Sequence, residues 1–64
     1  MDTVTAVRYA KTLAYVKSTG DTALLRKLQS LPDQRAREVA NVVEPLLHSL
    51  GPNARARIAE TIYT

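Results

Sequence analysis

The sequence predicts a small all-α protein, a bundle of three to four short helices. Apolar residues recur with helical spacing in four separate stretches, and residues suited to capping or stopping helices stand between those stretches. No run alternates polar and apolar residues as a half-buried strand would. Since the chain has only 64 residues, we expect a single helical domain over 1–64.

The first helix is predicted over 3–18, with Asp2 or Thr3 as its N-cap. Successive residues of a helix lie about 100° apart. In this projection the apolar residues spread over one half of the helix, which is wider than packing on a single neighbour requires. This half contains Ala6, Val7, Tyr9, Ala10, Leu13, Ala14 and Val16. Its alanines form a smooth ridge that another helix could approach closely.

The second helix is predicted over 22–31, with Asp21 as its N-cap and leucines on one side. The third, over 32–50, has the clearest apolar face and carries Pro45 in its interior. Pro45 removes one backbone hydrogen bond. Because the apolar spacing continues past it, we expect the third helix to be kinked at Pro45 and not to end there.

The last helix is predicted over 53–63. Gly51 and Pro52 are suited to ending the preceding helix, and Asn53 to capping this one. The remaining apolar residues of the segment form a narrow stripe, which consists of Ala54, Ile58 and Ile62.

The expected core is thin. The chain has no Cys, Phe or Trp and a single His, so neither a disulfide nor a structural zinc site can reinforce the fold. A second copy packed on the first helix would enlarge the core. We therefore expect that homodimerisation completes the bundle.

The composition and charge also argue against several classes of function. The net charge of +3 comes from nine basic and six acidic residues spread along the chain, which is weak support for nucleic-acid binding. No stretch approaches the roughly 20 apolar residues needed to span a membrane, and Asp2 does not suit a signal peptide. We expect a cytoplasmic protein without membrane contact. Its abundance of Ala, Arg, Leu and Val is compatible with a GC-rich bacterium or a phage.

No catalytic constellation is predicted. His48 falls on the polar side of its helix one turn after Glu44, where a solvated histidine is expected. Gly20 and Gly51 stand in separate turns and cannot form one phosphate-binding loop. We therefore expect no enzyme activity, no metal, no cofactor and no small-molecule substrate.

The leading hypothesis is a small regulator, adaptor or inhibitor that binds a protein partner through amphipathic helices. Its candidate contacts on the first helix are the apolar ridge and the polar residues beside it, with Tyr15 predicted between two basic residues on the polar side. A second exposed tyrosine is expected on the last helix. The candidate partner-binding residues are Ala6, Val7, Arg8, Ala10, Lys11, Ala14, Tyr15 and Tyr63.

A second hypothesis comes from residues 46–60, which faintly resemble a helix-turn-helix of DNA-binding regulators. The resemblance implies that Arg55 and Arg57, with Asn53, would contact DNA near the start of the second helix. Pro52 in the turn departs from the usual pattern. A capped amphipathic helix with solvated arginines is the alternative interpretation. A third hypothesis treats the chain as a docking module of a larger protein.

Overall fold

The computed structural model describes residues 2–63, except for the side chains of Leu50 and Pro52. These residues form helices joined by short turns and no strand, which confirms the all-α fold class. The elements are α1 (Thr3–Ser18), α2 (Thr22–Gln29), α3 (Asp33–Val43), the 3₁₀ turn η1 (Glu44–Leu46), α4 (Leu47–Leu50), the 3₁₀ turn η2 (Gly51–Asn53) and α5 (Ala54–Tyr63).

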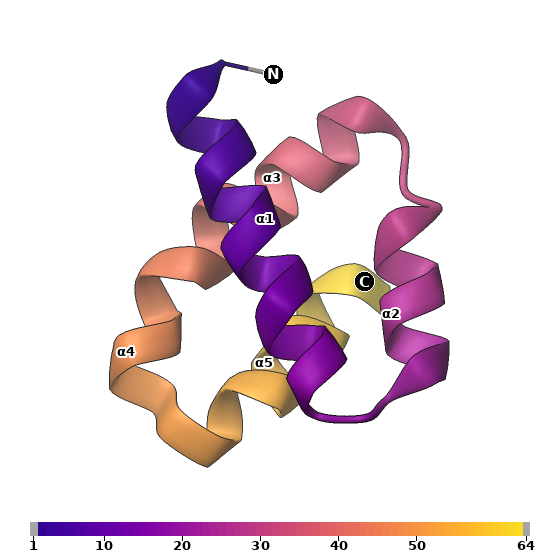
Figure 1. The fold of residues 1–64 in the computed structure, drawn as a ribbon, viewed down its shortest axis with the longest axis vertical. Coiled ribbons are helices and arrows are strands. Elements are labelled where there is room, and N and C mark those ends of the chain that lie inside the picture. Colours follow the sequence, from indigo (N-terminus) through magenta and orange to yellow (C-terminus); the bar gives the residue numbers. More distant parts are fainter. Residues whose placement is uncertain (1, 64) are drawn as a thin grey trace.

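The helices form a small bundle in which α1 crosses the front (Figure 1). α1 packs chiefly on α3 and also on α2, while α5 contacts both α3 and α2. In Figure 1 the last turns of α5 lie behind and between α1 and α2. No helix in the described part of the chain is long and apolar enough to span a membrane.

Two aspartates start helices as the sequence predicts. The side chain of Asp2 accepts a hydrogen bond from the amide of Thr5, and that of Asp21 accepts one from the amide of Leu24. Each bond satisfies an amide that has no partner within the helix itself. Gly20 and Gly51 adopt positive φ angles of 79° and 52°, which other residues rarely tolerate, and both stand in the turns predicted for them.

The segment predicted as one helix over 32–50 is divided into α3, η1 and α4. Pro45 lies in η1, directly after α3 ends at Val43. Because Pro45 has no amide hydrogen, it cannot continue the α-helical pattern, and the backbone there takes the tighter 3₁₀ form. The amide of Leu47 donates to the carbonyl of Glu44. Three segments in series therefore replace the single helix of the sequence-based prediction.

One aliphatic cluster forms the core. It draws residues from α1, α2, α3 and α5, all of them less than 5% exposed, and each of these helices turns one side toward it. The cluster consists of Val16, Leu24, Leu28, Val39, Val43, Ile58 and Ile62. The buried cluster itself is thus wholly aliphatic, and Tyr9 and Tyr15 pack against it from α1.

Two valines of α3 provide a matched test of this core. Val39 is fully buried, whereas Val42 is 47% exposed. We predict that Val39→Ala lowers the free energy of unfolding by about 1.5–3 kcal/mol, through lost burial and the cavity left behind. Val42→Ala should lower it by less than about 0.5 kcal/mol. Denaturant unfolding followed by circular dichroism measures both, and equal losses would contradict this description of the core.

Candidate functional site

The two sides of α1 differ in what they contact. Thr5, Thr12 and Val16 are its buried residues and face the rest of the bundle. On the opposite side, Ala10 and Ala14 are exposed. Burial is therefore centred on a side that contains two threonines, and most of the apolar half predicted from the sequence faces outward.

The buried threonines explain this orientation. The hydroxyl of Thr12 donates to the carbonyl oxygen of Arg8 at 2.9 Å, and the side-chain amide of Asn41 donates to the hydroxyl of Thr5 at 3.5 Å. With its polar group satisfied, a threonine can be buried at little cost. The sequence pattern marks both positions as polar, so these core-facing residues were missed. The available signal was that a threonine hydroxyl inside a helix can donate to the carbonyl oxygen four residues earlier, which satisfies the hydroxyl without water.

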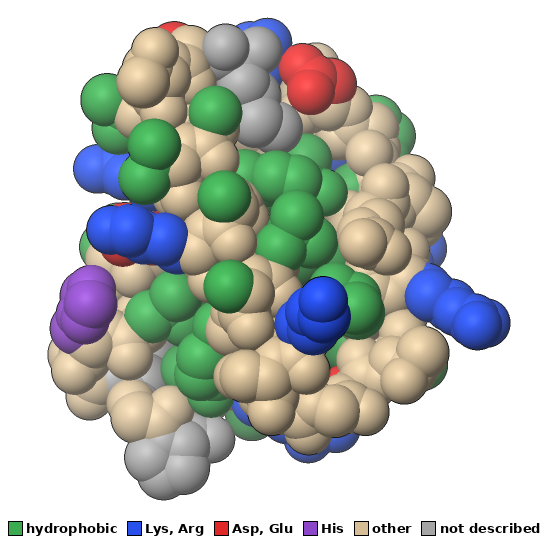
Figure 2. Space-filling view, viewed as in Figure 1, with side chains coloured by type: hydrophobic (Ala, Val, Ile, Leu, Met, Phe, Trp, Pro, Cys, Tyr) green, Lys and Arg blue, Asp and Glu red, His purple; other side chains and the backbone are tan. Residues whose placement is uncertain are grey.

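We call the exposed apolar side of this helix the α1 outer face. It begins with two large residues, since the side chain of Val4 is 57% exposed and that of Val7 is 48% exposed. Figure 2 shows apolar side chains spaced along α1, with Lys and Arg side chains on both sides of the helix. The α1 outer face consists of Val4, Ala6, Val7, Ala10 and Ala14.

A solvent-open hollow of about 290 Å³ adjoins the first half of this face. Val4 and Val7 supply apolar surface to it, and Arg8, Lys11 and Glu44 supply charge. Its lining also includes Thr3. The hollow therefore combines exposed aliphatic side chains with an ionic cluster.

The ionic cluster joins α1 to η1 and α3. Nε of Arg8 lies 3.7 Å from one carboxylate oxygen of Glu44, and Nζ of Lys11 lies 3.9 Å from the other. Arg8 also donates to the side-chain oxygen of Asn41 at 3.0 Å. These contacts place two of the predicted partner-binding residues, Arg8 and Lys11, beside the predicted apolar ridge. No feature of the sequence pattern indicated the part played by Asn41.

The two predicted tyrosine contacts lie apart from each other. Tyr15 is half-buried and packs against the core, and its hydroxyl donates to the carbonyl oxygen of Gly51 at 3.4 Å. The prediction that Tyr15 is exposed was therefore wrong, because this side of α1 packs toward η2. Tyr63 is 61% exposed, but it belongs to α5 and does not line the hollow beside α1.

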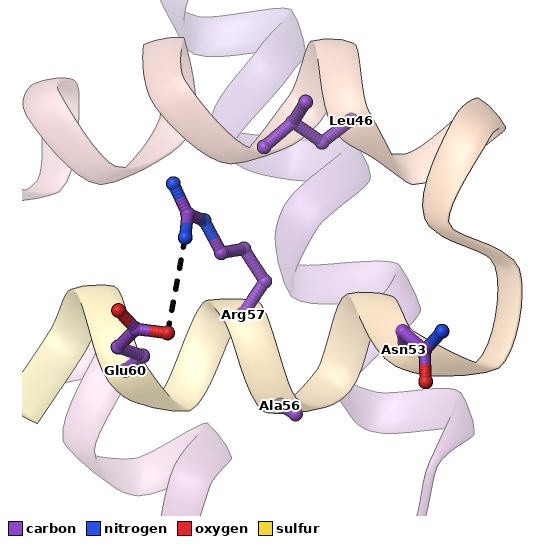
Figure 3. Close-up of a pocket in the computed structure, with 5 residues that line it drawn as sticks. All are labelled: Leu46, Asn53, Ala56, Arg57 and Glu60. Carbon is purple, nitrogen blue, oxygen red and sulfur yellow. Dashed lines mark ion pairs between the residues drawn. The ribbon is translucent and has the colours of Figure 1, made fainter.

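The residues predicted to contact DNA lie at and after the start of α5. Arg55 pairs with Asp21 at 2.5 Å, and Arg57 lies 3.8 Å from Glu60. Asn53 and Arg57 line a second hollow, of about 390 Å³, between η1 and α5. In Figure 3 Arg57 extends from α5 into the space below Leu46, beside Glu60. Both arginines thus pair with carboxylates of this chain.

The described part of the chain shows no candidate catalytic or metal site elsewhere. His48 is exposed on α4, as the helical pattern predicts. No group of three or more His, Asp or Glu side chains among the described residues could hold a metal ion. The α1 outer face and the adjoining hollow are therefore the surface that best supports a functional proposal.

The pair between Asp21 and Arg55 links the start of α2 to α5. The hydrogen bond from the Leu24 amide, together with the Arg55 guanidinium, holds the pKa of Asp21 below its ordinary value of 3.8. A carboxyl group whose pKa is lower in the folded state stabilises the fold above its unfolded pKa. That contribution is lost as the pH falls through the folded value.

We predict that the melting temperature falls as the pH is lowered from about 5 to about 2, partly because Asp21 becomes protonated. Asp21→Asn can still cap α2 but cannot form the ion pair. It should melt lower than the parent protein near neutral pH, and the difference should shrink as the pH approaches 2. Thermal unfolding by circular dichroism measures this, and a difference that stays constant with pH would contradict the assignment.

Comparisons with models of protein families, with curated proteins and with solved structures gave no significant match for this chain. The function must therefore be argued from the geometry and charge of the surfaces described above.

Proposed function

We propose that this protein is a small non-enzymatic regulator, adaptor or inhibitor, and that it binds a protein partner through the α1 outer face. The observation that carries the proposal is the orientation of α1. Its apolar residues extend beyond the side that packs on the bundle, so that Val4, Val7, Ala10 and Ala14 remain exposed along the helix.

The shape of this face suits another helix. Ala10 and Ala14 have short side chains, so a second backbone can approach α1 to the lower end of the usual 8–10 Å between packed helix axes. The larger valines at the start of the face add apolar area for burial. Such a surface is typical of helix-on-helix recognition, in which a partner helix contributes the matching residues.

A second copy of this chain is one partner that could occupy the face, and a homodimer through α1 stays part of the proposal. Sedimentation equilibrium at micromolar concentration measures the oligomeric state directly. A homodimer would give a mass above that of the monomer that decreases on dilution. A monomer mass throughout would exclude the homodimer and leave only binding to a different protein.

The proposal predicts that added bulk in the middle of the face blocks binding. Ala10→Gln introduces a larger uncharged side chain and should weaken partner binding by about 1–3 kcal/mol, or roughly five- to 150-fold, because it overpacks the interface. Its effect on folding should stay below about 0.7 kcal/mol, since Ala10 is exposed.

Capture experiments with immobilised protein and a bacterial lysate, quantified by mass spectrometry, measure this effect. Ala23→Gln is the matched control, because Ala23 is an exposed alanine of α2. We expect a captured protein that binds the parent chain and the control equally and binds Ala10→Gln much less. If Ala10→Gln captures the same proteins to the same extent, the α1 outer face is not the binding surface.

DNA binding remains an alternative prediction with less support. Arg55 and Arg57 each pair with a carboxylate of this chain, so each would have to exchange that partner for DNA. A gel shift with mixed duplex DNA at low salt tests this, since phosphate contacts are strongest there. A cytoplasmic location, a bacterial or phage source and a role as a docking module also stay predictions.

A further inference from the structure

We propose that the partner presents an acidic amphipathic helix to the α1 outer face, with an apolar stripe flanked by Asp or Glu. This inference rests on the proposed function and specifies the chemistry of the partner. It is argued from three observations: the hollow beside Val4 and Val7, the charge on both sides of the face, and the like charges that would meet if a second copy bound instead.

The hollow supplies an apolar contact. Val4 and Val7 contribute exposed aliphatic surface to it, and its volume is about 290 Å³. The hollow is open to solvent, so a leucine or methionine side chain of a partner helix could lie in it, next to the aliphatic part of the Lys11 side chain.

The ionic cluster at the same hollow has an excess of positive charge. One carboxylate, that of Glu44, faces the two cations of Arg8 and Lys11 at 3.7 and 3.9 Å. These distances exceed the roughly 2.7–2.9 Å of a charge-assisted hydrogen bond. The side chain of Lys11 is also 58% exposed, whereas that of Glu44 is 13% exposed. A second carboxylate, supplied by a partner, could therefore reach Lys11 from the solvent side.

A further cation lies toward the other end of the helix. Lys17 is exposed and forms no ion pair among residues 2–63. It follows Lys11 by six residues, which corresponds to about 9 Å along the helix axis. The sequence of α1, Thr3–Ser18, contains no Asp or Glu. The two lysines lie about 120° apart around the helix, so a partner with carboxylates on both edges of its apolar stripe, about 9 Å apart along the axis, would complement both.

These charges favour an acidic partner over a second copy. Packing α1 against α1 of another copy would bring two helices together that each carry Arg8, Lys11 and Lys17 and no acidic residue. Like charges across an interface oppose association, and opposite charges favour it.

The test uses the full chain and three synthetic helical peptides that share one Leu and Ala stripe. The flanking positions are Glu in the first, Gln in the second and Lys in the third. Binding is followed through the amide chemical shifts of the isotopically labelled protein, which also report where each peptide binds. We expect the Glu peptide to bind about tenfold more tightly than the Gln peptide at about 50 mM salt, and the difference to shrink at about 500 mM.

Two double variants test which lysines and arginines cause the preference for the Glu peptide. Lys11→Gln combined with Lys17→Gln should weaken binding of the Glu peptide about three- to tenfold, because two exposed ion pairs are lost. Arg26→Gln combined with Lys27→Gln removes the same net charge from α2 and should change the affinity less than about twofold. The largest shift changes should lie in α1 and near Glu44.

Three results would overturn the inference: no binding of the Glu peptide, equal binding of the Glu and Gln peptides, or equal effects of the two double variants. None of these outcomes decides the proposed function. That proposal depends on Ala10→Gln, which changes bulk without changing charge. If Ala10→Gln abolishes capture while the Glu and Gln peptides bind equally, the binding face is retained and its preference for acidic partners is rejected.

Discussion

The fold depends on filling one aliphatic cluster without Phe, Trp or disulfides. Its seven buried members come from four helices, so each helix must turn one particular side inward. α1 contributes only Val16 to the fully buried apolar set, and Tyr9, Leu13 and Tyr15 pack around it. Few apolar contacts with the core therefore determine which side of α1 faces inward. The polar residues on that buried side must find partners when α1 is oriented in this way.

Those polar contacts connect the first half of α1 to α3 and η1. Asn41 bonds both Thr5 and Arg8, while Glu44 lies between Arg8 and Lys11. A slip of α1 by one residue would separate these partners, whereas an all-aliphatic contact would tolerate it more easily. Directional polar contacts of this kind specify register more than they add stability. They also hold the cations of α1 beside its exposed apolar residues.

The basic residues of α1 and α5 differ in how they are paired, and this difference supports a binding role for the α1 outer face. Both helices carry exposed basic residues, but Arg55 and Arg57 pair with Asp21 and Glu60, and Arg55 helps to hold α5 against the start of α2. On α1, Arg8 and Lys11 share one carboxylate beside a hollow with aliphatic walls. Apolar surface next to incompletely paired charge is better suited to a partner than to packing within this chain.

The sequence by itself determined the helical class, the bounds of α1, and the caps at Asp2 and Asp21, because these depend on local spacing and on hydrogen bonds between near neighbours. It also placed Ala6, Val7, Ala10 and Ala14 on one side of α1. Only the tertiary structure decided that this side faces outward, that Tyr15 turns inward, and that α3 ends at Val43. Helical spacing shows which residues share a side, but the side that becomes buried depends on neighbouring helices. Thr5 and Thr12 could be buried because their hydroxyl groups find partners within the fold.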